Sequence, residues 1–333
     1  MRKDSSKEQD FIKKVKKGEF NFSYSSLNKL IFSPSLFYKD YILMDREIRT
    51  DKHLVKGKLI HLLILQPEEF DNNFVVMPSK LPSDTLRKVL YDITLYTDST
   101  ELSLVEDKII LDSLKTVGLY QSLKDEAKRI AKVRTTECED YYAFSHHKGE
   151  DVIDNDTLLK CTESVELIKN NKSIMELLSD EPTDFEMDGL EVYNEKYLTC
   201  PLTEYEFGLH GYIDRYVVNH ETKEIKVIDV KTTGKTISDF SETVQFYNYW
   251  LQAAAYVTLV QKNVAKSAAN YKISFNFIVI DKYNQIYDFP VSIKTMNAWG
   301  EGLKQTLTMA KFHIEENNYE LPYQFLQTKK VIL

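Results

Sequence analysis

The pattern of apolar residues changes once along the chain, near Glu181-Pro182, and this change limits the fold more than any other feature. Before it, apolar residues recur at three- and four-residue spacing, which predicts helices. These helices are expected at 54–65, 83–97, 108–133 and 155–178. After it, segments rich in Tyr, Val and Ile predict strands, at 183–200, 204–218 and 225–230.

The rest of the second half mixes the two patterns. It predicts a helix at 238–261, strands at 272–280 and 287–293, and a helix at 295–316. Helices and strands are thus largely segregated, which indicates an α+β fold with a small mixed sheet flanked by helices and a helical N-terminal half. Three parts are expected: a flexible Lys- and Glu-rich tail at 1–20, a helical region at 21–180 and a sheet-containing core at 181–333.

Composition excludes several classes of protein. The chain carries 43 Lys and Arg against 51 Asp and Glu, a net charge of −8, so it is not a polycation that coats nucleic acid. Its three cysteines are far apart, which argues against a disulfide framework or a structural zinc site and fits a reducing compartment. With no apolar leader and no apolar run long enough to cross a bilayer, a cytoplasmic protein without a membrane is expected.

A predicted β-hairpin carries the most informative residues. If Asn219 and Glu224 close its four-residue loop, Asp214 lies directly opposite Asp229 on the neighbouring strand. Because side chains alternate along a strand, Lys231 falls on the same face as Asp229. The sequence therefore predicts that two carboxylates and one ammonium group converge.

This convergence suggests a metal-dependent hydrolase. Opposed like charges destabilise a sheet, and a hard divalent ion such as Mg²⁺ or Mn²⁺ is the natural counter-charge. Such an ion, with Lys231 beside it, suits phosphodiester hydrolysis. Two alternatives remain open: Asp214 with Arg215, and Asp229 with Lys231, are ordinary solvated pairs, or a one-residue slip in register separates the three groups.

The following helix adds two polar residues. Gln252 and Tyr256 are four positions apart, so they project from one face of the helix, with Tyr249 one turn earlier. Taken alone, Tyr249 and Tyr256 are better explained as core aromatic residues than as substrate contacts.

Together these motifs resemble the PD-(D/E)XK nuclease superfamily. The residues that carry the resemblance are Ile213-Asp214, Asp229-Val230-Lys231 and the Gln252-x-x-x-Tyr256 helix. Ile213 stands where the family name has Pro. The branch with a Q-x-x-x-Y helix includes RecB-type nuclease domains, CRISPR adaptation nucleases and RecE (exonuclease VIII)-like phage exonucleases, and the stretches 23–41 and 56–78 resemble the RecE-like group in particular.

The resemblance implies a metal site. In the family a His in a G-x-x-x-H helix completes it, and Gly57 and His61 occupy those positions. It thus implies that His61, Asp214 and Asp229 bind the ion, with the Val230 carbonyl as a further ligand. Without the resemblance, His61 among Leu and Ile would be interpreted as a packing residue.

The resemblance also implies roles in catalysis. Lys231 would be catalytic, and Gln252 and Tyr256 would position the DNA backbone or the lysine. Glu204 is a candidate outer carboxylate. The family's iron–sulfur cluster needs cysteines near the C-terminus, and none follows Cys200, so the cluster is not expected.

Function and partners follow from the same resemblance. It implies a nuclease core at 181–333 with His61 supplied by 21–180, and an exonuclease that resects double-stranded DNA ends 5′ to 3′ in phage-type recombination. It further implies a ring-like homo-oligomer and a single-strand annealing protein as partner. The open alternatives are a DNA-binding or assembly protein that keeps the nuclease fold without turnover, and a structure-specific endonuclease or RNase on the same core.

One further motif is weaker. The run 229–236, DVKTTGKT, imitates a phosphate-binding P-loop but begins with Asp in place of Gly. A carboxylate there would face the bound phosphate, so a nucleotide-hydrolysing function is a minor alternative.

Overall fold

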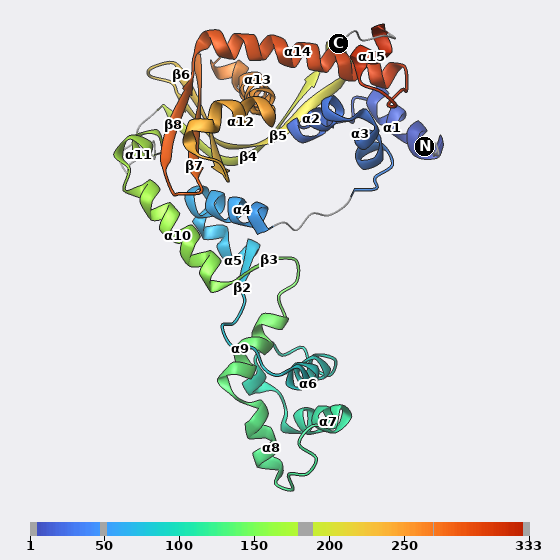
Figure 1. The fold of residues 1–333 in the computed structure, drawn as a ribbon, viewed down its shortest axis with the longest axis vertical. Helices are drawn as coiled ribbons and strands as arrows, with labels where there is room; N and C mark the ends of the chain where they lie inside the picture. The colour runs from blue at the N-terminus through green and yellow to red at the C-terminus, as the bar shows by residue number, and fades with distance from the viewer. Residues whose placement is uncertain (1–4, 47–51, 179–188, 269, 329–333) are drawn as a thin grey trace. The chain divides into compact units, whose positions relative to one another are not determined.

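The chain forms two compact units. One comprises Met1–Thr50 with Glu166–Leu333, and the other comprises Asp51–Val165. The computed structural model describes residues 5–46, 52–178, 189–268 and 270–328 (Figure 1). The units divide the chain after Thr50 and after Val165 and not at the expected boundary near residue 180, because the first 50 residues and the sheet share one core, to which Phe22 and Leu27 both belong.

The first unit, here called the sheet unit, is built on a mixed six-stranded sheet. Its strands are β1 (Asn21–Phe22), β4 (Leu190–Leu202), β5 (Phe207–Asn219), β6 (Glu224–Thr233), β7 (Lys272–Asp281) and β8 (Ile286–Val291). The order is β1-β5-β6-β7-β8, and β4 also pairs with β5. The β6–β7 and β1–β5 pairs are parallel, and the other pairs are antiparallel.

The register of the β5–β6 hairpin is the one that the sequence predicts. Asn219 pairs with Glu224, and the ladder continues to the pair Arg215 and Ile228. The segment 220–223 is the polar turn between the strands. Strand alternation and turn chemistry are local properties, which is why this register is readable from the sequence.

Helices surround this sheet. They are α1 (Ser5–Lys16), α2 (Tyr24–Phe32), α3 (Pro34–Phe37), the π-helical turn Tyr38–Ile42, α11 (Lys172–Leu178), α12 (Phe240–Phe246), α13 (Tyr249–Ala268), α14 (Ile293–Glu315) and α15 (Tyr323–Thr328), with 3₁₀ turns at Thr203–Tyr205 and Ile237–Asp239. Helix α13 connects the parallel strands β6 and β7, packs on strands β4 to β7, and is covered by α14 (Figure 1). The α+β fold with a small mixed sheet flanked by helices is thus confirmed.

Helix α1 corrects the expectation of a flexible tail at 1–20. Residues 5–16 are helical, and Phe11 and Val15, one turn apart, are buried in the core of the sheet unit. Phe11 also makes edge-on ring contacts with Phe20 and Phe37. The four-residue spacing of these two apolar side chains among lysines is sufficient for docking, although it is too short to be recognised as a periodic pattern.

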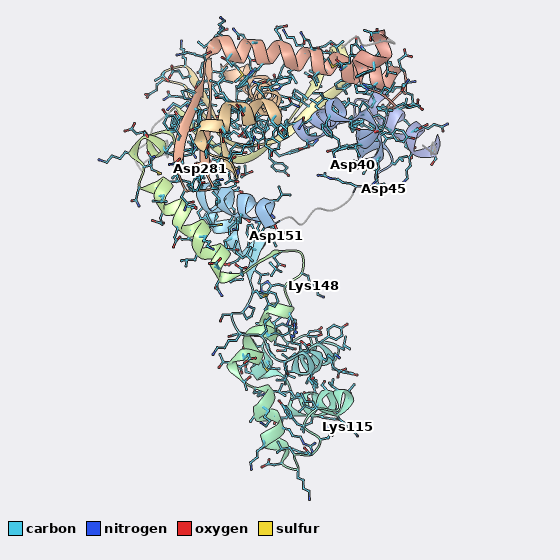
Figure 2. All side chains as sticks on the ribbon, in the orientation of Figure 1. Asp40, Asp45, Lys115, Lys148, Asp151 and Asp281 are labelled. Atoms are coloured by element: carbon cyan, nitrogen blue, oxygen red, sulfur yellow. The ribbon has the colours of Figure 1, made fainter. Side chains whose placement is uncertain are left out.

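The end of β7 is tied to the turn after β6. The buried carboxylate of Asp281, labelled in Figure 2, accepts hydrogen bonds from the backbone N–H groups of Ile237, Tyr283 and Gln285. The P-loop-like run lies in β6 and this turn, and the 3₁₀ turn Ile237–Asp239 follows it. Because residues 229–233 of the run continue β6, the run does not form the loop that leads directly into a helix in a phosphate-binding site.

The second unit, residues 51–165, is mainly helical. Its elements are α4 (Lys52–Leu65), α5 (Phe70–Asn73), α6 (Asp84–Thr94), α7 (Asp107–Val117), α8 (Glu126–Val133), α9 (Thr136–Ser145), most of α10 (Asn155–Lys169), the 3₁₀ turns Pro67–Glu69 and Leu102–Leu104, and the parallel strands β2 (Phe74–Val76) and β3 (Asp151–Ile153). A core from α6, α7 and α9 includes Leu90, Ile93, Ile110 and Tyr142.

One predicted helix of this unit is two helices. The expected element 108–133 breaks after Val117, where Gly118 adopts a left-handed conformation with φ of 76° and caps α7. Glycine reaches this conformation without the steric cost that a Cβ brings. Among the described residues of the chain, no helix is long and apolar enough to cross a membrane.

Candidate active site

Asp214 and Asp229 lie where strands β5 and β6 stop pairing. The hydrogen-bonded ladder ends at Arg215 and Ile228, and the two aspartates are the next residues in the same register. The Oδ2 atom of Asp214 accepts a hydrogen bond of 2.8 Å from the backbone N–H of Val230. The Asp214 side chain therefore binds the neighbouring backbone at the point where backbone pairing of the two strands ends. Both carboxylates are buried, with exposed fractions of 6% for Asp214 and 0% for Asp229.

Lys231 joins these carboxylates from β6. Its Nζ atom lies 2.5 Å from Oδ2 of Asp229, and its side chain is 12% exposed. Burial alone would lower the pKa of Lys231, but the charges of Asp229 and Asp214 outweigh burial and hold the pKa above its ordinary value. The structure thus brings together the three residues of the predicted hairpin, and the lysine is charged at neutral pH.

Gln252 and Tyr256 reach the same place from α13. The Nε2 atom of Gln252 donates a hydrogen bond of 2.8 Å to the Tyr256 hydroxyl. Burial, followed by the charges of Asp214 and Asp229, raises the pKa of Tyr256 well above its ordinary value. The ring packs on Gly211 of β5, where an added Cβ would come within 3.3 Å of it. Among the described residues, Gln252 Oε1 is buried without a hydrogen-bond partner.

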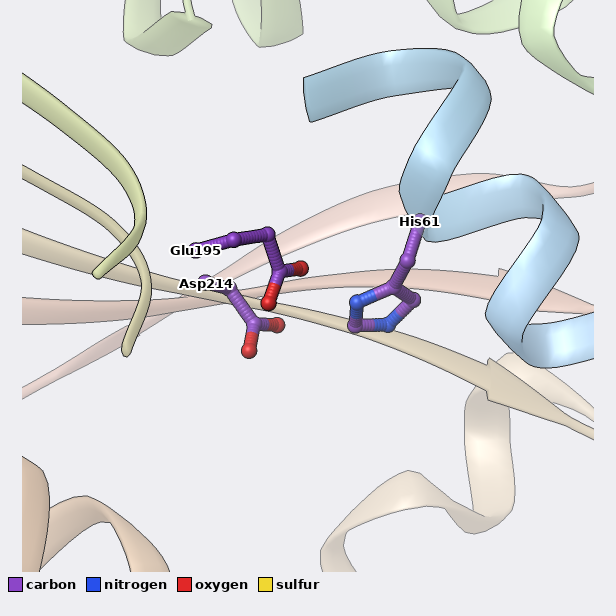
Figure 3. A group of neighbouring side chains, drawn as sticks. All are labelled: His61, Glu195 and Asp214. Carbon is purple, nitrogen blue, oxygen red and sulfur yellow. The ribbon is translucent and has the colours of Figure 1, made fainter. Parts of the chain in front are cut away.

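The sequence interpretation missed Glu195. In the β4–β5 ladder, Asn194 pairs with Arg215 and Lys196 pairs with Ile213, so Glu195 stands opposite Asp214. Figure 3 shows the two carboxylates pointing toward one another, and each offers an oxygen within 4.8 Å of the other. Extending the register argument to the β4–β5 hairpin would have identified this residue.

Glu204, the candidate outer carboxylate, does not take this position. It is exposed in the 3₁₀ turn between β4 and β5, where its backbone carbonyl accepts a hydrogen bond of 3.0 Å from Lys311. It lies ten positions before Asp214 in the chain, and the β5 residues from Phe207 to Ile213 separate its turn from Asp214. Glu195 therefore replaces Glu204 as the acidic neighbour of Asp214.

Two tyrosines lie near the buried pair Asp229 and Lys231. The ring of Tyr249 lies 5.1 Å from the Lys231 ammonium group. Tyr24, on α2, has its pKa raised by burial and then by the nearby Tyr249 and Asp229. Its position follows from the helix start, because the Ser23 and Ser26 side chains form a capping box that begins α2 at Tyr24. The only sequence signal for Tyr24 was the resemblance of 23–41.

His61 lies in the other unit. It projects from α4, as Figure 3 shows, and its side chain is partly buried. Four residues earlier on the same helix is Gly57, as the sequence pattern requires. Its assignment as a metal ligand stays a prediction from the sequence.

The donor set of the sheet unit fits a hard divalent cation. Asp214, Asp229 and Glu195 offer carboxylate oxygens, and two of these residues are almost fully buried. Lys231 supplies one positive charge close to the two buried carboxylates, so the cluster has an excess of negative charge. Oxygen donors with excess negative charge are what Mg²⁺ and Mn²⁺ bind.

One of the comparisons with known proteins identifies a family. The family model described as the PD-(D/E)XK nuclease superfamily matches residues 21–321. No curated protein matches the chain. Among solved structures, a candidate exonuclease from Eubacterium rectale is similar, with 11% sequence identity, a TM-score of 0.47, and coverage of 96% of this chain and 91% of that one. From the family match, which spans most of its length, the chain belongs to the PD-(D/E)XK nuclease superfamily.

Proposed function

We propose that this nuclease is a metal-dependent exodeoxyribonuclease that degrades double-stranded DNA ends, 5′ to 3′, as RecE-like enzymes do in phage-type recombination. One observation carries the hydrolytic part: the buried pair Asp229 and Lys231 lies beside Asp214 where two strands separate. The choice of DNA ends and of polarity rests on the resemblance of 23–41 and 56–78 to the RecE-like group.

The proposed metal is Mg²⁺ or Mn²⁺. His61, Asp214 and Asp229 would hold it, with the Val230 carbonyl as a further ligand and Glu195 as the carboxylate beside Asp214. When bound, such an ion polarises the phosphoryl oxygen and lowers the pKa of a bound water. The Val230 N–H orients Asp214 for this task, because it donates a hydrogen bond to the Oδ2 atom of this carboxylate.

The other residues act on the substrate. The charged Lys231 stabilises the negative charge that develops on the phosphoryl group, or orients the attacking water. The hydrogen-bonded pair Gln252 and Tyr256 positions this lysine or the DNA backbone. The Tyr256 hydroxyl lies near the carboxylates of the site, because the charges of Asp214 and Asp229 both raise its pKa. A fixed, buried set of polar groups needs no reorganisation when the reaction occurs.

The proposed partners follow from the same resemblance. They are double-stranded DNA, further copies of the chain in a ring, and a single-strand annealing protein that receives the exposed strand. The cytoplasm, that of the host for a phage-encoded protein, is the proposed location.

Two labelled substrates test this proposal. Linear duplex DNA labelled at the 5′ or the 3′ terminus is incubated with the protein and Mg²⁺ or Mn²⁺, with a chelator as control. Early release of mononucleotides from the 5′ label alone supports the proposal. Release from the 3′ label reverses the polarity, cleavage of circular DNA or RNA indicates an endonuclease or RNase, and binding without cleavage indicates a nuclease fold without turnover.

A further inference from the structure

A row of three aromatic side chains leads from the surface of the sheet unit to Lys231. Phe246 and Tyr247 meet edge to face with ring centroids 4.9 Å apart, and Tyr247 stacks on Tyr249 at 5.6 Å. Tyr249 in turn lies 5.1 Å from the Lys231 ammonium group. Phe246, Tyr247 and Tyr249 are here called the aromatic row. The outer two side chains are exposed, Phe246 at 73% and Tyr247 at 45%.

Exposure alone does not set this row apart. Tyr283, for example, is 64% exposed and its ring lies 5.0 Å from the Lys282 ammonium group, but it stacks on no other aromatic ring of the residues that the structure describes. The aromatic row instead ends at a lysine inside the site. A second positive charge lies at its outer end, where Lys235 Nζ is 5.4 Å from the Phe246 ring.

The backbone that carries the row is held in place by α2. The Tyr247 carbonyl accepts hydrogen bonds from the Tyr24 hydroxyl and from the Asn28 side chain. Asn248, in a left-handed conformation with φ of 56°, donates to Asn28 at 2.8 Å. Asparagine tolerates this conformation better than most residues. Exposed rings on a fixed turn lose little entropy when a ligand stacks on them.

We propose that the aromatic row is a stacking platform for one unpaired nucleobase that flanks the phosphodiester bound at Lys231. Every base has a π-face, so aromatic rings bind bases without reading their sequence. Lysines at both ends of the row suit the phosphates on either side of that base. The inference rests on the proposed nuclease function and deepens it, because a stacked base means that the site takes one strand whose end is opened.

Abasic substitution tests the stacking directly. Oligonucleotides with a short single-stranded 5′ end, each with an abasic site at a different position, are bound with Ca²⁺ in place of Mg²⁺ and measured by fluorescence anisotropy. For the unaltered protein, we expect an abasic site at one position to weaken binding by about tenfold. The double variant Phe246→Ala/Tyr247→Ala should bind the normal strand about tenfold more weakly and lose its sensitivity to that abasic site.

Matched variants separate stacking from folding. Tyr287→Ala removes another exposed aromatic residue, 58% exposed on the edge strand β8, and should keep both the affinity and the abasic effect. Tyr247→Phe keeps the ring and should behave like the unaltered protein. The inference is overturned if no abasic position matters, or if the double variant loses the same affinity for normal and abasic strands. If the unaltered protein shows the abasic effect in binding but does not cleave DNA in Mg²⁺, the proposed function is rejected and the stacking platform is not.

Discussion

The two units differ in what they bury. Among its described residues, the sheet unit buries five charged side chains, those of Glu8, Asp214, Arg215, Asp229 and Asp281. Among the described residues of 51–165, no Asp, Glu, Lys or Arg is buried, and the buried polar residues are Ser113 and Ser164. Burying a charge costs several kcal/mol unless it is paired. The cost is therefore concentrated in the unit that carries the sheet.

Within the sheet unit, most buried charges are balanced in a simple way. Arg215 donates to the Asn194 side chain and to the Leu178 carbonyl, each at 2.7 Å, and Asp281 accepts three backbone N–H groups. Asp214 and Asp229 differ, because two carboxylates share the charge of Lys231. The comparison indicates that the candidate active site lies where buried charges are not matched by an equal number of opposite charges or by backbone hydrogen bonds.

The largest effect is expected from Asp229→Asn or Lys231→Ala. Each removes a charge from the cluster, so cleavage of linear duplex DNA with Mg²⁺ should fall by on the order of 10³-fold or more. Asp288→Asn, a partly buried carboxylate on β8, is the matched control and should remain active. Turnover is measured at saturating DNA, and circular dichroism checks the fold. Full activity in either site variant would reduce the cluster to a structural ion pair.

Ile93→Ala tests the apolar side of the comparison. Ile93 is fully buried in the core of α6, α7 and α9, so the cavity should lower the free energy of unfolding by about 2–5 kcal/mol. Leu95→Ala, two residues on and 61% exposed, should stay within about 0.5 kcal/mol of the unaltered protein. Urea unfolding of both variants provides the measurement. Equal stability of the two would mean that this core contributes little.

His61→Ala asks whether 51–165 contributes to the chemistry. Losing one metal ligand should raise the Mg²⁺ concentration for half-maximal cleavage by about 10- to 100-fold. His147→Ala, an exposed histidine of the same unit that contacts Glu150 at 3.2 Å, should leave it unchanged. Metal titrations of the two variants are compared with that of the unaltered protein. An unchanged titration for His61→Ala would leave this histidine a packing residue of α4.

The smallest effect concerns pH and a buried neutral histidine. Burial lowers the pKa of His313 in the folded chain, against a weaker raising effect of its hydrogen bond to the Asn318 carbonyl. Below the ordinary value of 6.5, the unfolded chain therefore binds a proton that the folded chain resists, and stability falls as the pH falls. The slope cannot exceed about 1.4 kcal/mol per pH unit for one group.

His313→Gln checks this dependence. Free energies of unfolding between pH 8 and pH 5 should fall less steeply for the variant. The slope should shrink without vanishing, because burial also lowers the pKa of His210. Parallel curves for the two proteins would show that His313 does not contribute.

The β5–β6 hairpin is the part of the site that could be predicted from the sequence. Its turn and its alternation are properties of adjacent residues, so the pairing of Asn219 with Glu224 could be predicted, and with it the meeting of Asp214, Asp229 and Lys231. The i, i+4 geometry of Gln252 and Tyr256 is local in the same sense, and the hydrogen bond between them is seen.

The misplaced elements depend on distant contacts. The twelve residues of helix α1 do not by themselves indicate a stable helix. It is stabilised because Phe11 and Val15 are buried against the rest of the sheet unit. The division of the chain at residues 50 and 165 is decided in the same way, because β1 pairs with Gly208 and Leu209, far along the chain.

The sequence by itself determined the α+β class, the hairpin register and the residues that meet on it, because strand alternation, turn chemistry and helical periodicity act between near neighbours. Only the tertiary structure decided that Tyr24 of α2 lies near Tyr249 and Asp229, and that Phe246, Tyr247 and Tyr249 form a row that ends at Lys231. Those juxtapositions join segments far apart in the chain, and they arise when packing and loop closure bring the segments into one core.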